Sequence, residues 1–213
     1  MRIVYQQELG EIQSRLVEIA ELVVTAIKQA TEAFGTSNVE LAEEVIDGGD
    51  LIDQKTNELD SLVVDVMARQ QPVASDLRLM VSSLRMSSSL ERMADLAGHI
   101  AQLSRYRYPE SAIPKGLRKI FKRMAEVDVE MAEGLVELLR TFEPKTLNEI
   151  RDLDDILDEL HSRVFEKVLS DKLSDNPTGV VDATLASRYH ERFGDHAVNV
   201  CKQVNFFVSG ALD

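Results

Sequence analysis

The segment Glu91-Arg-Met-Ala-Asp95 recurs one hundred residues later as Glu191-Arg-Phe-Gly-Asp195. The flanking residues match too, because a serine stands four positions before each copy and an alanine two positions after it. An internal repeat of this kind indicates a duplicated structural unit, so whatever its carboxylates do is done twice. The repeat also suggests a chemistry, since carboxylates four residues apart lie on the same side of a helix.

Long helices are the secondary structure that the rest of the chain favours. The 213 residues include only 10 Gly and 5 Pro, and apolar residues repeat at spacings of three and four throughout. Turn-forming residues divide this pattern into six segments. We expect helices at about 3–34, 39–70, 75–106, 115–142, 144–173 and 181–212, with Pro177 and Gly179 in the turn before the last one.

Helices of ~30 residues are about 45 Å long, and short turns between them favour antiparallel neighbours. We therefore predict an all-α fold of two tandem antiparallel three-helix bundles. The polar connection from Pro109 to Pro114 places the boundary, so the first bundle should comprise residues 1–108 and the second residues 109–213. The pair Gly48-Gly49 is a weak point where the second helix could kink.

Composition excludes several classes of function. The net charge is −13, which disfavours binding to DNA or RNA because phosphate neutralisation needs a basic face. Cys201 is the only cysteine, so no internal disulfide can form, as in reduced intracellular proteins. The N-terminus lacks the apolar core of a signal peptide, and no stretch approaches the ~20 apolar residues of a membrane span. We expect a cytoplasmic protein with no direct membrane insertion.

Polar and acidic side chains form stripes on the second and third helix of each half. Each residue advances about 100° around a helix, which puts Tyr189, Phe193 and Ala197 on the core face of the last helix and its acids nearly opposite. If the second and third helices are neighbours, the stripes of each half converge along one outer groove. The stripes are Asp50, Asp53, Asn57 and Asp60; Glu91, Asp95 and His99, extended by Ser83 and Ser87; Asp155, Asp158 and Ser162; and Glu191, Asp195 and Asn199.

A groove of like charges repels itself and raises some of its own pKa values unless a cation neutralises it. Carboxylate oxygens are the ligands that Mg²⁺, Ca²⁺, Mn²⁺ and iron take, and His99 would add a nitrogen donor. We therefore predict a surface metal ion or cluster on each bundle, against the alternative of a solvated acidic face without a ligand. The predicted ligands are Asp50, Asp53, Glu91, Asp95, His99, Asp155, Asp158, Glu191, Asp195 and Asn199.

A catalytic role is disfavoured. Di-iron carboxylate bundles use Glu ligands and Glu-x-x-His pairs that project into the core, whereas only Asp158-Glu-Leu-His161 approaches that pattern. The sequence has no Gly-rich phosphate loop, Ser-His-Asp signature or Cys-His zinc motif. We therefore predict no catalytic and no organic cofactor-binding residues. A metal-dependent enzyme, a metal store and a purely structural scaffold remain as alternatives.

Three segments together resemble the PhoU family of phosphate-signalling proteins. They are Gln71-Pro-Val-Ala-Ser-Asp-Leu-Arg-Leu79, the duplicated Glu-Arg-x-x-Asp, and Gly194-Asp-His-Ala-Val-Asn199. The resemblance covers nearly the whole chain and implies a tandem pair of three-helix bundles. It also implies a cytoplasmic negative regulator of the phosphate-starvation response, often a homodimer. Such a protein links the ATPase subunit of the phosphate ABC transporter to a membrane sensor histidine kinase.

The resemblance further implies multinuclear iron or zinc clusters on the bundle surface, held by Glu/Asp-x-x-x-Asp motifs. Manganese and magnesium remain candidates from the ligand chemistry. The chain departs from the family pattern mainly in its first half. His99 stands where Asn, Asp or Glu is usual, Asn57 where an acid is common, and Ala94 where Gly is usual; in the second half Phe193 replaces Ile. We expect the first groove to differ from the family more than the second.

Overall fold

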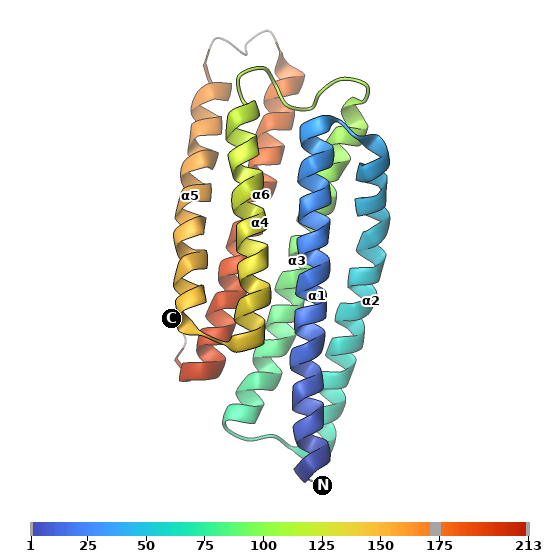
Figure 1. The fold of residues 1–213 in the computed structure, drawn as a ribbon, viewed down its shortest axis with the longest axis vertical. Coiled ribbons are helices and arrows are strands. Elements are labelled where there is room, and N and C mark those ends of the chain that lie inside the picture. Colours follow the sequence, from blue (N-terminus) through green and yellow to red (C-terminus); the bar gives the residue numbers. More distant parts are fainter. Residues whose placement is uncertain (1, 171–175, 212–213) are drawn as a thin grey trace.

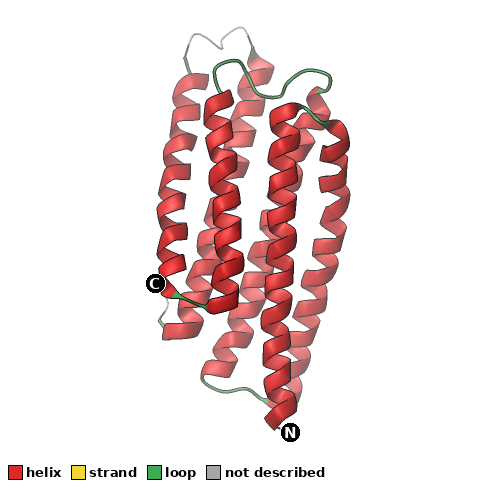
Figure 2. Cartoon of the chain, viewed as in Figure 1, coloured by secondary structure: helices red, strands yellow, loops and turns green. Residues whose placement is uncertain are grey.

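The computed structural model describes residues 2–170 and 176–211, and no strand occurs within these ranges (Figure 2). The all-α prediction is confirmed, as is the number of long helices in the described chain. No helix there combines the length and the apolar character that a bilayer crossing requires. The helices are α1 (Arg2–Thr36), α2 (Val39–Gln70), α3 (Ser75–Arg107), α4 (Arg118–Thr141), α5 (Pro144–Val168) and α6 (Pro177–Ser209).

The start of α2 follows from one capping residue. Asn38 precedes the helix, and its side-chain oxygen accepts a hydrogen bond from the backbone N–H of Leu41 at 3.1 Å. This bond satisfies one of the N–H groups that a helix leaves without a partner in its first turn. The helix then runs unbroken through Gly48 and Gly49, so the weak point in the sequence does not interrupt it.

The last helix begins earlier than the sequence predicts. Pro177 and Gly179 lie inside α6 and not in a preceding turn, because proline is tolerated where the first N–H has no helical partner anyway. Asn176 caps the helix by accepting from the Gly179 N–H at 2.9 Å. At the other end, Gly210 adopts φ +79°, a left-handed conformation that ends the helix at Ser209. The predicted end of the fifth helix, near residue 173, lies outside the described residues.

The six helices run up and down side by side (Figure 1). Helices α1, α2 and α3 pack on one another, as do α4, α5 and α6, which confirms the two antiparallel three-helix bundles. The bundles also pack on each other, α1 along α4 and α3 along α6, and the buried apolar residues of both form a single cluster. The domain boundary at residue 108 stays a prediction, and it falls in the connection between α3 and α4.

Antiparallel contacts between α3 and α6 form a seam with a constant register. Near the end of α3, Arg107 binds Asp182 through Nε to Oδ2 at 2.5 Å and Nη2 to Oδ1 at 2.9 Å. Nearer its start, Arg85 lies 3.5 Å from the side-chain oxygen of Gln203. Each step forward along α3 is therefore a step backward along α6. This register places the two copies of Glu-Arg-x-x-Asp opposite each other in the middle of the seam.

A polar pair lies inside the shared core. His190 of α6 and Asp128 of α4 are 1 % and 0 % exposed, and Nδ1 of the imidazole lies 2.5 Å from Oδ2 of the carboxylate. The rings of Phe34 and Phe121 flank the imidazole, with centroids 6.5 and 6.0 Å away. The sequence alone does not predict this pair, because the pairing depends on which helix covers that side of α6.

Candidate functional site

The acidic stripes of α5 and α6 meet in the second half, and their groove contains a carboxyl whose pKa is strongly raised. The pKa of Asp154 is raised to about 6. Burial is the largest cause, and the negative charges of Asp158, Asp195, Asp155 and Glu191 follow in that order. All four acids that the sequence assigned to this groove therefore act on one carboxyl. Asp154 itself was missed, since the matching position of the first half is a glycine.

Close packing of α5 on α6 explains why Asp154 is half-buried. A Cβ added at Gly194 would lie 2.7 Å from Oδ1 of Asp154 and 2.8 Å from Cδ2 of Leu157, so only glycine lets the two helices approach this closely. The first half has the opposite arrangement, with Ala94 on α3 and Gly49 on α2. The two halves thus carry the larger side chain on opposite helices, but a Cβ added at Gly49 would have no neighbour within 4 Å, so Ala94 does not fill the space in the first half.

Glu191 is less exposed than its position opposite the core face predicts. Its side chain is 13 % exposed and contacts the Arg188 guanidinium, and Oε2 is buried without a hydrogen-bond partner among the described residues. Burial and the charge of Asp195 raise its pKa, while Arg188 and His161 act in the other direction. Helical phase places Glu191 away from the core face, but α5 packs on one side of α6 and leaves little of this side chain exposed.

The first groove gathers a similar set of acids from α2 and α3. Burial and then the charges of Asp53 and Asp95 raise the pKa of Glu91. Asp50, Asp53, Asp95 and His99 line a hollow of about 220 Å³, which exists because Gly49 and Gly98 leave the space empty. Burial also raises the pKa of Asp60, lower on α2. The two sequence stripes of this half therefore do converge.

Two polar residues of the predicted stripes are buried and two are exposed. Ser83 and Ser87 are 0 % and 1 % exposed, so they do not extend an outward stripe. The reason is that α3 packs against α1, α2 and α6 and has little free surface. Asn199 is exposed and makes no hydrogen bond to a described residue, and the exposed Asn57 donates to the carbonyl oxygen of Asp53.

The carboxylate oxygens of both grooves are suitable ligands for a hard cation, but the described side chains are not arranged around one. No three His, Cys, Asp or Glu side chains within the described ranges are arranged to hold a metal ion. Two candidate ligands already have cationic partners: Asp95 pairs with Arg92 at 2.8 Å, and Glu191 with Arg188. Each ion pair engages one carboxylate oxygen and competes with a metal for it, while Oε2 of Glu191 has no hydrogen-bond partner among the described residues.

The PhoU domain family model matches residues 16–104 and 121–204. The chain belongs to the PhoU family. The "Phosphate-specific transport system accessory protein PhoU homolog 2" of Mycobacterium tuberculosis is 35% identical to it over 212 residues, which cover all of both chains. The PhoU homolog 1 of Mycobacterium leprae is 34% identical and covers all of this chain and 96% of its own.

Solved structures give the same family and fold. The crystal structure of PhoU from Pseudomonas aeruginosa superposes with a TM-score of 0.88 at 27% identity, covering 97% of this chain and 100% of that one. PhoU from Streptococcus pneumoniae gives the same TM-score at 21% identity, with 98% and 99% coverage, which supports the fold. Each PhoU domain match contains one acidic groove, so the duplicated family unit and the duplicated site coincide.

Proposed function

We propose that this PhoU family member is an accessory protein of phosphate transport and a negative regulator of the phosphate-starvation response. The observation that carries the proposal is full-length similarity to proteins named phosphate-specific transport system accessory proteins, at up to 35% identity. In this role the chain is an adaptor. It binds the ATPase subunit of the phosphate ABC transporter and a sensor histidine kinase, and it passes transport status to the kinase by protein contact.

A deletion strain tests the regulatory role. Removal of the protein should leave phosphate-starvation genes switched on in high phosphate, and re-expression of the intact chain should restore repression. Transcript levels of a starvation gene measured at high and low phosphate give the readout. Normal repression in a deletion strain that carries no second PhoU gene would reject the regulatory proposal.

Co-purification tests the adaptor role separately. The tagged chain should recover both the ATPase subunit and the kinase from membranes solubilised in mild detergent. Variants that replace exposed residues of the 71–79 segment, such as Val73→Asp at a side chain that is 73 % exposed, identify the contact surface without unfolding the core. Recovery of neither partner by the wild-type chain would favour a structural scaffold.

We also propose that the acidic grooves bind iron, zinc, manganese or magnesium ions. The support is the crowding of carboxylates around Glu91 and Asp154, whose pKa values are raised by burial and then by the neighbouring negative charges, a repulsion that a cation would relieve. Elemental analysis of protein purified without a metal-affinity tag tests this directly. Asp158→Asn should lose metal, and the exposed neighbour Glu159→Gln should keep it. No bound metal, and no uptake on titration, would reject the metal sites and leave the adaptor role standing.

The remaining parts of the proposal are a homodimer and a cytoplasmic location. Sedimentation equilibrium on the purified chain should give twice the 23.9 kDa of one chain. A purely monomeric profile at micromolar concentration would reject the dimer. Fractionation should place the protein with soluble cytoplasmic markers when its partners are deleted, and recovery in the periplasm would reject the location.

A further inference from the structure

The arginines of the duplicated motif meet in a hollow at the α3–α6 seam. Its volume is about 450 Å³, within the range of small-molecule sites. Arg92 and Arg192 are the second residues of the two Glu-Arg-x-x-Asp copies, so the repeat itself supplies one guanidinium from each bundle. The acids of the motif belong to the grooves, which leaves the arginines without a role there. The cationic and ring side chains that line the hollow are Arg92, His99, Arg188, Tyr189, Arg192 and His196.

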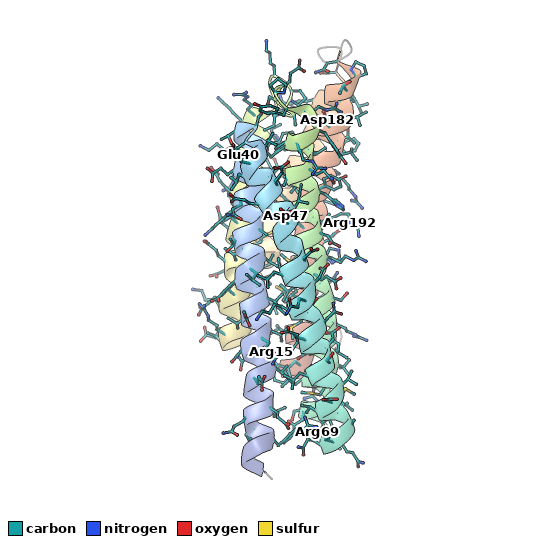
Figure 3. All side chains as sticks on the ribbon, turned by 90° about the vertical axis from the view of Figure 1, so that its right-hand side faces the viewer. Arg15, Glu40, Asp47, Arg69, Asp182 and Arg192 are labelled. Carbon is teal, nitrogen blue, oxygen red and sulfur yellow. The ribbon has the colours of Figure 1, made fainter. Side chains whose placement is uncertain are left out.

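Three guanidinium groups in one hollow are unexpected in a chain of net charge −13. Asp95 is the only carboxylate among the lining residues, and it is held by Arg92 at 2.8 Å. Arg188 contacts Glu191. Arg192 makes no hydrogen bond or ion pair to another described residue, and Figure 3 labels it on the side of the molecule where α3 and α6 adjoin. The lining residues therefore leave an excess of positive charge that an anion would neutralise.

Aromatic rings form another wall of the same hollow. The His99 ring of α3 lies against the Tyr189 ring of α6 with centroids 5.1 Å apart and an interplanar angle of 36°. Tyr189 is half-buried: it packs against the core, as predicted, and it also lines the hollow. Nδ1 of His196 is buried in this region without a hydrogen-bond partner among the described residues. The hollow thus combines guanidinium donors, a flat apolar ring surface and an unused polar atom.

We propose that this hollow binds a phosphate group, either free or carried by a nucleotide whose base lies against Tyr189. The planar guanidinium matches two phosphate oxygens at once, and such charge-assisted hydrogen bonds are about twice as strong as neutral ones. One arginine from each bundle would contact the same anion, so the ligand would bridge the seam. This hollow adjoins the first acidic groove, because Asp95 and His99 line both, but its existence does not depend on the proposed role in transport.

Calorimetric titration of the purified full-length chain tests the site. The probes are inorganic phosphate, ATP, and acetate as an anion of different geometry, all at fixed ionic strength and with a chelator so that no metal bridges protein and phosphate. Arg92→Gln and Arg192→Gln each remove one guanidinium and should weaken binding roughly tenfold or more. Arg85→Gln is the matched control, because Arg85 lies on the same helix and seam but does not line the hollow. Circular dichroism confirms that each variant is folded.

The outcomes separate the two sources of phosphate. Saturable phosphate binding that falls in both arginine variants and survives Arg85→Gln supports the site. Tighter binding of ATP, weakened by Tyr189→Leu while phosphate binding is unchanged, assigns the site to a nucleotide. Three results would overturn the proposal. They are an affinity for acetate equal to that for phosphate, undiminished phosphate binding in both arginine variants, and no binding of phosphate or ATP up to about 10 mM.

Discussion

Replacement of Asp128 by alanine should destabilise the protein strongly, although the residue is not among the predicted site residues. Asp128 supplies the hydrogen-bond partner of His190 Nδ1 at 2.5 Å, and Nε2 of the same ring has no hydrogen-bond partner among the described residues. Without the carboxylate, the imidazole would be buried with neither nitrogen satisfied. Phe34 and Phe121 flank the ring, so water cannot readily replace the lost partner.

The size of the effect follows from the burial of both partners. Removing one partner of a buried polar pair leaves the other unsatisfied, which costs about 3–5 kcal/mol when the pair is charged, and the cavity left by the carboxylate adds to the loss. Burial raises the pKa of Asp128, an effect that His190 opposes. A loss of about 4 kcal/mol, with a urea m-value near 3 kcal/mol/M, lowers the unfolding midpoint by more than 1 M.

Urea unfolding followed by circular dichroism measures this change. Asp65→Ala, at an exposed aspartate of α2, should stay within about 0.5 kcal/mol of wild type. The double variant Asp128→Leu/His190→Leu should recover most of the loss, because apolar replacement of a whole buried pair is often neutral or stabilising. A loss below about 1 kcal/mol in Asp128→Ala would refute the reasoning, since the pair would then contribute little to the core.

Three further changes have expected outcomes of known sign. The pKa of Asp154 is about 6 in the folded state against an ordinary value of 3.8, so its ionisation destabilises the fold as pH rises through 6. After allowance for screening, Asp154→Asn should therefore raise the free energy of unfolding at pH 7 by roughly 1 kcal/mol, a gain that disappears below pH ~4. Gly194→Ala should lower the melting temperature, because its Cβ would overlap the buried Leu157, at a net cost of about 1–2 kcal/mol. Arg107→Ala should cost about 2–3 kcal/mol in urea unfolding by leaving Asp182, whose side chain is 5 % exposed, without its bidentate partner.

Each of these predictions has its own control. A stability gain in Asp154→Asn that is the same at pH 4 and pH 8 would contradict the titration of that carboxyl. Gly98→Ala should be neutral or stabilising by up to about 1 kcal/mol, since an added Cβ there has no neighbour within 4 Å. If it destabilises as much as Gly194→Ala, close packing is not the cause. Arg105→Ala, at an exposed arginine two positions before Arg107, should leave stability nearly unchanged, so a loss equal to that of Arg107→Ala would rule out a specific effect of the ion pair.

Local sequence predicted most helix boundaries, and where it erred the cause was also local. The limits of α2 agree with the predicted 39–70, because Asn38 caps one end and the chain turns before Pro72 at the other. The start of α6 was placed about four residues late, because Pro177 was interpreted as a turn residue although it suits the first turn of a helix. The predicted acids of each half converge as expected, but Asp154 could not be found from the repeat because its counterpart is Gly49.

Residue spacing is enough to show that this protein is a duplicated set of long amphipathic helices with two acidic stripes in each half. Those features depend on spacing along one chain segment, which is visible without a structure. Which faces of each helix are covered by a neighbouring helix is visible only in the tertiary structure. Helical phase gives the direction of a side chain around its own axis, and only the neighbouring helix decides whether that direction meets solvent. For this reason Glu191 is largely covered by α5, His190 meets Asp128 inside the core, and the two motif arginines meet at the α3–α6 seam.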